Sequence, residues 1–257
     1  MHPEIDIGPV TLQTFGICFA AAFVAGGALI WKRLKELDLP PDWSYEMVFA
    51  ALAGGAVGSR VYFLIQNYDS VSHDLFSGGG LVWYGGLIGG ALAVAGWAWW
   101  RGFLGLALLD LAAPALALGY AIGRCGCQLS GDGDYGKAWD GPWAMAYPDG
   151  TVPTDRTVHP TPIYETLAMG LCAWLLWQLR DKVRPGVLFA IYLVYAGVER
   201  FLVEFIRRNP VDALGLTAAQ IESVGLIAAG LLWIAIVIRR HGGISRQSAK
   251  DPMPRPA

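Results

Sequence analysis

Charged residues are scarce in this chain of 257 residues: Asp, Glu, Lys and Arg together make up only 16%. In soluble domains about a quarter of the residues are charged. Hydrophobic residues reach 54% of the chain. This composition excludes an ordinary water-soluble domain and indicates an integral membrane protein. No nucleotide-binding glycine motif or internal repeat is found, and no nucleic-acid partner is expected.

Metal-binding motifs are also lacking. None of the four cysteines (Cys18, Cys125, Cys127, Cys172) forms a CxxC pair or a Cys/His cluster with metal spacing. The C-x-C of Cys125 and Cys127 is too short for a relaxed disulfide, which favours small packing residues. We therefore expect no metal and no cofactor.

Long apolar runs, by contrast, are abundant. A helix needs about 20 apolar residues to cross ~30 Å of hydrocarbon. Seven runs meet this requirement approximately, at 9–31, 45–66, 81–100, 106–129, 161–179, 186–206 and 216–238. The predicted fold is an all-α polytopic membrane protein with seven transmembrane helices.

Basic residues are distributed unevenly around these runs. With the N-terminus outside, the inner loops and tail hold twelve Lys and Arg residues, and the outer segments hold four (Lys137, Arg156, Arg207, Arg208). Lys and Arg are enriched on the cytoplasmic side of membrane proteins, so the C-terminus is predicted to be cytoplasmic. The segment MHPEIDIG lacks the basic residues of a cleaved signal peptide, so the first run is expected to remain as a membrane span.

The longest stretch outside the membrane is expected at about 130–160, which is rich in Gly, Pro and Asp. It has room for a small outer, periplasmic cap or a pair of short strands, but not for a second domain. We expect one transmembrane domain over 1–240 and a disordered cytoplasmic tail over 241–257.

Arginines inside the apolar runs are candidates for function, because a cation in hydrocarbon is costly unless it is paired, hydrated or bound to an anion. Arg124 lies near the end of the run at 106–129 and either snorkels to the headgroups or binds an anion. Arg200, Glu204 and Arg207 share one helical face, as a structural ion pair or as an anion site oriented by Glu204. Two guanidiniums facing one cavity would favour a bound phosphate.

Glycines are dense in SGGGLVWYGGLIGG, which includes Gly85 and Gly86. Glycine permits a backbone to unwind or to approach a ligand inside a membrane, and the alternative is helix packing alone. Arg60 follows a run of small residues in the second apolar segment and is a weaker candidate for chemistry.

The chain resembles the prolipoprotein diacylglyceryl transferase family over nearly its whole length. The segments that carry the resemblance occur in the family's order: GPVTLQTFG, GSRVYFLIQN, YGGLIGG, DLAAPALALGYAIGRCGCQLSGDGDYG, HPTPIYE, RPGVLFAIYLVYAGVERFLVEFIR and AQIESVG. The resemblance implies a multi-pass enzyme of the bacterial inner membrane. Such an enzyme moves the diacylglyceryl group of phosphatidylglycerol to the lipobox cysteine of a preprolipoprotein and releases glycerol-1-phosphate.

The resemblance also implies roles for individual residues. Arg124 matches the essential arginine of the family's GRxGN signature, and Arg200 matches that of the sixth helix, with Glu204 and Arg207 as its companions. His159, Tyr164 and Glu165 match the family's HPxQxYE. The expected catalytic residues are Arg124, Arg200, Glu204 and Tyr84, and the expected substrate-binding residues are Arg60, Arg207, Gly85, Gly86, His159 and Tyr164.

Several positions depart from the family pattern, mainly on the acceptor side. Tyr84 replaces a histidine, Phe15 replaces a tyrosine and Cys127 replaces an asparagine; Ser130 and Asp132 also differ. A neutral imidazole accepts a thiol proton at neutral pH, whereas a phenol with a pKa of about 10 is a poor base. Two alternatives therefore remain: a phosphatidylglycerol-consuming transferase with another acceptor, and a non-catalytic lipid-binding or transport protein. Asp132 and Asp134 are interpreted as loop residues, with catalytic and capping roles left open.

Overall fold

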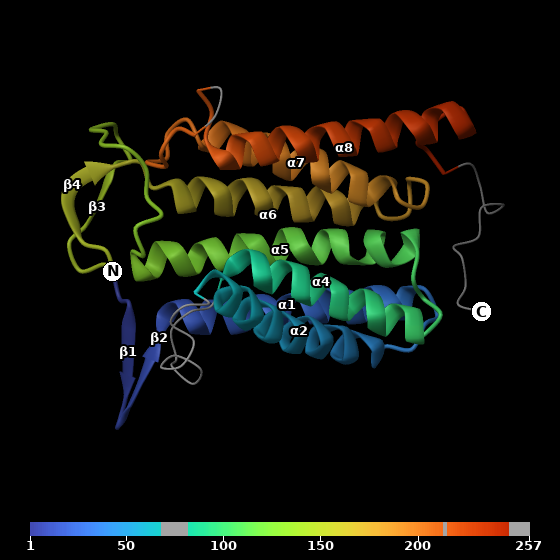
Figure 1. Cartoon of the computed structure of the whole chain (residues 1–257), viewed down its shortest axis with the longest axis horizontal. Coiled ribbons are helices and arrows are strands. Elements are labelled where there is room, and N and C mark those ends of the chain that lie inside the picture. The colour runs from blue at the N-terminus through green and yellow to red at the C-terminus, as the bar shows by residue number, and fades with distance from the viewer. Residues whose placement is uncertain (68–81, 213–214, 247–257) are drawn as a thin grey trace. The chain divides into compact units, whose positions relative to one another are not determined.

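The computed structural model describes residues 1–67, 82–212 and 215–246. Over these ranges the chain is mostly helical, as expected, with two short antiparallel hairpins (Figure 1). The expected outer loop at 68–80, with Gly78 to Gly80, and most of the tail at 241–257 lie outside the described residues.

Seven helices are found in the described residues, each close to one of the apolar runs. They are α1 (Thr14–Glu36), α2 (Trp43–Gln66), α4 (Trp83–Trp100), α5 (Leu106–Ser130), α6 (Thr161–Leu179), α7 (Val187–Val203) and α8 (Ala218–His241). Four of them, α1, α2, α5 and α8, are long and apolar enough to cross a membrane. The remaining three have 17 to 19 residues, so seven spans stay a prediction.

The first helix begins later than its apolar run. Residues at the start of that run form β2 (Val10–Gln13), which pairs with β1 (Glu4–Ile7) in an antiparallel hairpin. Gly8, at the turn, has a φ of +61°, which glycine adopts without steric cost, and Pro9 has no N–H for a helix to use. The apolar run at 9–31 did not detect this hairpin, because β2 was counted as the start of the run and β1 precedes it.

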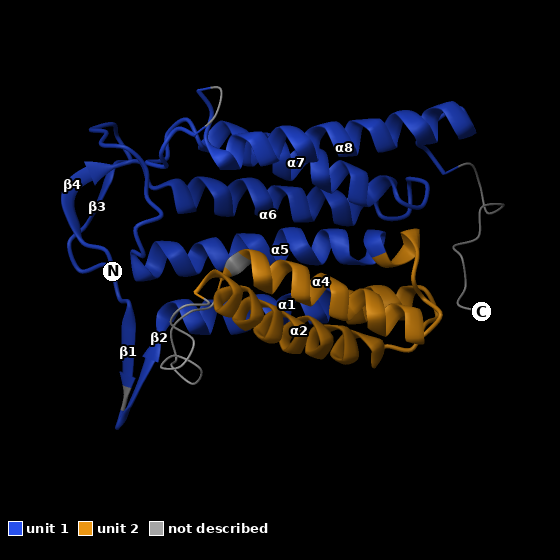
Figure 2. Cartoon of the chain, in the orientation of Figure 1, with its two compact units in different colours: residues 1–29, 109–252 blue, residues 30–108, 253–257 orange. Residues whose placement is uncertain are grey.

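The chain divides into two compact units (Figure 2). Unit 1 comprises residues 1–29 and 109–252, and unit 2 comprises mainly residues 30–108. The boundaries fall within α1 and α5. A single domain over 1–240 remains a prediction.

Unit 1 has a core formed by α5, α6, α7 and α8. Met169 and Leu176 of α6 and Val187 of α7 have no exposed surface, and alanines of α5 pack against them. A carboxylate of α5 holds the start of α7: Asp110 accepts hydrogen bonds from the N–H groups of Gly186 and Phe189, at 2.6 and 3.0 Å. These donors have no partner within their own helix, so Asp110 caps α7 from outside.

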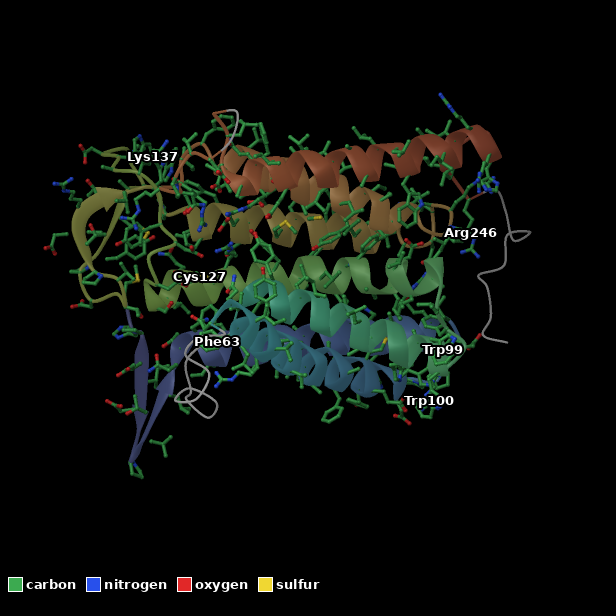
Figure 3. The ribbon with its side chains drawn as sticks, in the orientation of Figure 1. Phe63, Trp99, Trp100, Cys127, Lys137 and Arg246 are labelled. Carbon is green, nitrogen blue, oxygen red and sulfur yellow. The ribbon has the colours of Figure 1, made fainter. Side chains whose placement is uncertain are left out.

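Unit 2 is built around the crossing of α2 and α4, where glycines of both helices let the backbones touch. A Cβ at Gly85 would lie 2.9 Å from Cα of Ser59, and one at Gly58 would lie 2.7 Å from Cα of Gly89. Trp99 and Trp100, at the end of α4, are largely exposed (Figure 3). Exposed tryptophans at a helix end are typical of a membrane interface.

The segment expected as an outer cap contains β3 (Met145–Tyr147) and β4 (Thr154–Val158), which pair antiparallel. This agrees with the expected pair of short strands. The hairpin follows α5 and precedes α6, and the ring of Tyr135 stacks on the fully buried Tyr147 at 4.7 Å between centroids. The cap therefore has a small aromatic core of its own.

Candidate functional site: a cluster of three arginines and three carboxylates

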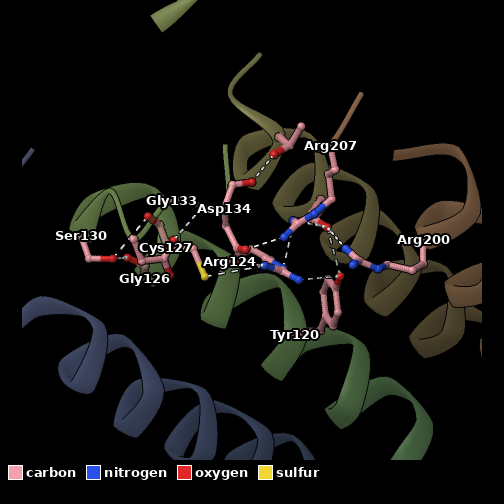
Figure 4. A network of polar contacts seen from close by, with 12 residues as sticks. Tyr120, Arg124, Gly126, Cys127, Ser130, Gly133, Asp134, Arg200 and Arg207 are labelled. Carbon is pink, nitrogen blue, oxygen red and sulfur yellow. Dashed lines mark hydrogen bonds and ion pairs between the residues drawn. The ribbon is translucent and has the colours of Figure 1, made fainter. Parts of the chain in front are cut away.

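The ends of three helices in unit 1 bring their charged residues together. Arg124 lies in the last turns of α5, Glu165 in the first turns of α6 and Arg200 in the last turn of α7. Arg207 follows α7, and Asp134 belongs to the loop after α5 (Figure 4). Side chains from separate parts of the sequence thus form one cluster, which we call the arginine cluster: Arg124, Asp134, Glu165, Arg200, Glu204 and Arg207.

The end of α7 differs from the expected run at 186–206. The helix ends at Val203, so Arg207 lies in a turn beyond it. Pro210 follows after Asn209 and prevents a helix from continuing through this turn, because proline lacks the N–H that a helix needs. Arg207 still lies on the side of Glu204, with its Nε 3.9 Å from Oε2, so the predicted charged face persists past the helix.

Glu165 lies at the centre of the cluster and has no exposed surface. Its Oε2 lies 2.9 Å from Nε of Arg124, and its Oε1 accepts hydrogen bonds from Nη1 of Arg200 at 3.2 Å and of Arg207 at 3.5 Å. The hydroxyl of Tyr120 donates to the same Oε1 at 3.3 Å. A buried carboxylate is costly unless it is paired and hydrogen-bonded, and these four groups meet that requirement.

Glu204, which is also almost fully buried, forms an ion pair with the second terminal nitrogen of Arg200. Its Oε2 lies 3.1 Å from Nη2 of Arg200, and its Oε1 accepts a hydrogen bond from Nδ2 of Asn209. The ion pair between Arg200 and Glu204 is thus present. Because Arg200 also contacts Glu165, its guanidinium is held from two directions, and its conformation is fixed before any ligand binds.

Asp134 bridges two of the arginines. Its Oδ2 contacts Nη1 of Arg124, and its Oδ1 contacts Nη2 of Arg207. Burial alone would raise the pKa of Asp134, but the attraction of Arg124 and then of Arg207 outweighs it, so the pKa lies below its usual range. Asp134 was interpreted from sequence as a loop residue, and the structure adds this bridge.

Three other residues at the end of α5 and in the loop after it, Cys127, Ser130 and Asp132, lie near the cluster. Burial raises the pKa of the Asp132 carboxyl, which lies beside the buried thiol of Cys127. Nη1 of Arg124 is 3.8 Å from Sγ of Cys127. Ser130, the last residue of α5, donates a hydrogen bond from its hydroxyl to the carbonyl of Gly126 at 2.8 Å. Ser130 therefore supports the turn that carries the loop.

One group of side chains has the composition of a metal site. Cys127, Asp132 and Asp134 place one ligand atom each within 4.8 Å of one another. However, both carboxylate oxygens of Asp134 already contact arginines, and the guanidinium of Arg124 lies beside Cys127. These cations would repel a metal ion, so this geometry favours an anion site.

The comparisons with known proteins point to one family. The family model of prolipoprotein diacylglyceryl transferase matches residues 4–236. A phosphatidylglycerol--prolipoprotein diacylglyceryl transferase of Clostridium tetani is 31% identical, over 90% of this chain and 96% of its own. Proteins with the same name from Pseudomonas fluorescens and Pseudomonas paraeruginosa are each 31% identical, over 91% and 93% of this chain and 95% and 96% of their own.

The chain belongs to the prolipoprotein diacylglyceryl transferase family. The resemblance noted in the sequence is thereby confirmed. Within this framework, Arg124, Arg200 and Glu204 lie in one cluster, as does Arg207. Their catalytic roles remain predictions.

Two further candidate residues of the family motif, His159 and Tyr164, lie at the cap. The imidazole of His159 stacks on Trp139, with ring centroids 4.3 Å apart, and its Nδ1 is 3.4 Å from the hydroxyl of Tyr164. Trp143 donates a hydrogen bond from Nε1 to that hydroxyl at 2.7 Å. Burial lowers the pKa of His159, which keeps the imidazole neutral at pH 7. The contacts described for both residues connect α6 to the cap.

Four candidates belong to unit 2: Arg60 in α2, and Tyr84, Gly85 and Gly86 in α4. Arg60 lies 5.3 Å from the ring centroid of Phe63. Gly85 lies at the helix crossing, where any Cβ would collide with α2, whereas a Cβ at Gly86 would meet nothing closer than 3.6 Å. Helix packing alone therefore accounts for Gly85, and no contact with a ligand is needed to explain this glycine. The role of these four residues toward a substrate stays a prediction.

Phe15, which replaces a tyrosine of the family, lies on α1 beside α5. A Cβ at Gly126 would lie 3.4 Å from the Phe15 ring and 2.9 Å from Cβ of Cys18. Gly126 precedes Cys127, another departure from the family pattern. Phe15 thus packs against the turn of α5 that also carries Cys127.

Sequence reasoning did not select two residues that the cluster depends on, Glu165 and Asp134. Glu165 was seen only as part of a motif, although an acidic residue expected inside a membrane helix requires a cationic partner. The count of charges gave a second signal for a further buried acid, because Glu204 alone cannot neutralise three arginines. Asp134 had no comparable signal, since acidic loop residues are common.

Proposed function

We propose that this chain is a membrane transferase that moves the diacylglyceryl group of phosphatidylglycerol to the lipobox cysteine of preprolipoproteins. The main support is the arginine cluster, in which Arg124 and Arg200 are both held by the buried Glu165 and retain partial exposure. Guanidiniums held side by side at the ends of apolar helices suit a phosphate that enters from the bilayer.

The proposed step is a displacement at the glyceryl carbon that carries the phosphate. The acceptor sulfur forms a bond to this carbon, the carbon–oxygen bond to phosphate breaks, and glycerol phosphate leaves with the electron pair. The thiol proton goes to a general base, a role for which the phenol of Tyr84 is poorly suited because its ordinary pKa is about 10. Arg124 and Arg200 bind the headgroup and stabilise the charge that develops on the leaving phosphate, while Glu165 and Glu204 orient them.

We also propose that the protein resides in the bacterial inner membrane with seven spans, an outer N-terminus and a cytoplasmic C-terminus. The four long apolar helices and the excess of basic residues in the expected inner segments support this arrangement. The arginine cluster would then lie at the outer ends of α5 and α7, and the β3–β4 cap would cover it from the periplasm.

A second candidate function keeps the same donor and changes the acceptor. The observation that favours it is the position of Phe15, an apolar ring beside the turn that carries Cys127. Together with Tyr84, these residues replace groups that could activate a thiol. The donor site would be unaffected, because its three arginines and their carboxylates are all present.

The test uses the purified full-length protein in vesicles that contain labelled phosphatidylglycerol and a lipobox peptide. Arg200→Ala is expected to lower transfer by about 10²–10³-fold, the typical effect of losing one stabilising donor. Arg208→Ala is the matched control, because Arg208 lies over the ring of Tyr135 and donates to the Gly133 carbonyl in the cap. Undiminished transfer by Arg200→Ala would overturn the assignment. Release of glycerol phosphate without peptide modification would favour the second candidate.

A further inference from the structure

Asp134 occupies a position that suits the substrate phosphate. Each of its carboxylate oxygens contacts a different guanidinium, one from Arg124 and one from Arg207 (Figure 4). A phosphate presents oxygens to paired arginines in a similar way. The carboxylate therefore resembles a bound ligand at the site where the proposed function requires an anion.

Asp134 differs from the other two carboxylates of the cluster in how it is held. The side chains of Glu165 and Glu204, on α6 and at the end of α7, have no exposed surface, whereas that of Asp134 is 33% exposed. Asp134 also lies in a loop rather than in a helix. Among the three acids, Asp134 is the one that can leave the arginines for water without a helix having to move.

The backbone around Asp134 is anchored independently of its side chain. Its carbonyl accepts a hydrogen bond from Oγ1 of Thr161 at 2.6 Å, and its N–H donates to Oδ1 of Asp132 at 3.2 Å. A change of side-chain rotamer would therefore release the carboxylate while the loop stays in place. Such rotamer changes are fast compared with catalytic turnover.

The net charge of the cluster also favours the departure of one carboxylate when a phosphate binds. Arg124, Arg200 and Arg207 contribute three positive charges, and Asp134, Glu165 and Glu204 contribute three negative charges, so the cluster has no excess positive charge. The carboxyls of Asp132 and Glu199 lie close enough to act on Arg124 as well. Adding the single negative charge of a phosphodiester would leave a net negative charge in a medium of low dielectric constant, which is costly. Balance returns when one carboxylate moves out to water as the phosphate enters.

We propose that Asp134 is an internal competitor for the headgroup phosphate: it pairs with Arg124 and Arg207 in the empty site and is displaced when phosphatidylglycerol binds. This proposal rests on the proposed function, because it assigns a regulatory role within the same site. Before binding, Asp134 gives Arg124 and Arg207 a second carboxylate partner in addition to Glu165. After transfer, its return to the arginines expels the glycerol phosphate.

A purely structural role for Asp134 predicts the opposite effects. If Asp134 only positioned Arg124 and Arg207, its neutralisation would loosen them and weaken anion binding. If it competes with phosphate, its neutralisation strengthens anion binding and slows product release. The direction of the change in affinity therefore separates the two roles.

The experiment measures binding of glycerol-1-phosphate to the full-length protein in detergent by calorimetry, together with KM and kcat for phosphatidylglycerol in vesicles. Asp134→Asn is expected to bind glycerol-1-phosphate about tenfold or more tightly and to show a lower KM and a lower kcat, since tenfold corresponds to only about 1.4 kcal/mol. Asp140→Asn is the matched control, because this exposed cap carboxylate contacts Thr157. Equal or weaker binding by Asp134→Asn overturns the proposal.

Because the Asp134 variants could fold poorly, the unfolding temperature is measured with and without glycerol-1-phosphate. Glycerol-1-phosphate is expected to raise the unfolding temperature of Asp134→Asn and Asp134→Ala more than that of the original protein, because the phosphate then supplies the missing anion. Asp134→Glu, which keeps the charge, should not gain affinity. If both neutral variants stay unfolded at saturating glycerol-1-phosphate, Asp134 is a structural brace and the proposal fails.

The two proposals fail in different ways. If the original protein transfers lipid and binds glycerol-1-phosphate, but Asp134→Asn binds it no better, only the role of Asp134 is wrong. If the original protein releases no glycerol phosphate and binds none, the proposed function is wrong, and the role of Asp134 falls with it.

Discussion

Nε of Arg124 lies 2.9 Å from Oε2 of Glu165, a carboxylate with no exposed surface. This contact joins α5 to α6, and the same carboxylate also accepts hydrogen bonds from Arg200 and Arg207. One buried side chain thus orients three cations that belong to different segments. The proposed donor site depends on Glu165 as much as on the arginines.

Replacement of Glu165 by Gln is expected to disrupt this site strongly. It leaves three guanidiniums without their shared partner, and removal of one member of a buried ion pair costs about 3–5 kcal/mol. Transfer from phosphatidylglycerol should fall by about 10²-fold or more, because the arginines lose their orientation. Unfolding in detergent and turnover in vesicles measure the two effects. Glu165→Asp keeps the charge and should retain more stability and more turnover than Glu165→Gln. Equal losses in the two variants would contradict the central role of the charge.

The acid sensitivity of the protein should depend on Asp134. Burial alone would raise the pKa of Asp134, but Arg124 and Arg207 lower it further than burial raises it. A lowered pKa contributes stability that is complete above the ordinary Asp value of about 3.9 and is lost as the pH falls through the lowered value. The unfolding temperature of the original protein should therefore drop more steeply than that of Asp134→Asn below about pH 4. Parallel profiles for the two proteins would show that the pairs contribute nothing.

Substitution of neighbouring glycines separates helix packing from ligand binding in unit 2. Gly85→Ala places a methyl group against α2 and should cost about 1–3 kcal/mol, as overpacking does. Gly86→Ala has room and should be neutral or stabilising, because Ala is favoured over Gly in helices by about 0.5–1 kcal/mol. Thermal unfolding checks both values. A large loss of activity in a stable Gly86→Ala variant would instead indicate backbone contact with substrate.

The acceptor can be tested by restoring family residues. The double variant Phe15→Tyr, Tyr84→His supplies the groups that the family has at these positions. If the acceptor is a lipobox cysteine, transfer to a lipobox peptide should rise by about tenfold or more, since a general base contributes about 10²–10⁴-fold. Mass spectrometry of the peptide measures the product. Unchanged transfer, with glycerol phosphate still released, would favour another acceptor; Phe15→Leu serves as the control for changed packing.

The helices were predictable because their signal is local. Apolar runs predicted all seven described helices, and several bounds agree within two residues, as for α4 and α6. The exceptions lie at the ends of helices, where hydropathy is a poor guide. The strand β2 falls inside the run counted as the first apolar segment, and α7 ends at Val203, three residues before the end of its apolar run at 206.

The candidate arginines were predictable because charge is expensive in hydrocarbon. Arg124, Arg200 and Glu204 attracted attention for that reason, and family membership follows from the order of motifs along the chain. Which groups neutralise these arginines could not be determined in this way, because partners come from distant segments. Glu165 is 41 residues from Arg124 and was noted only as part of a motif.

The sequence by itself thus determined the membrane class, the helices and the family. Only the tertiary structure decided that Glu165 is the shared partner of three arginines, that Asp134 bridges two of them, and that Gly85 serves a helix crossing. The physical reason is range. Hydrophobic periodicity acts along the chain, whereas the pairing of buried charges and the close approach of backbones depend on which helices meet in space.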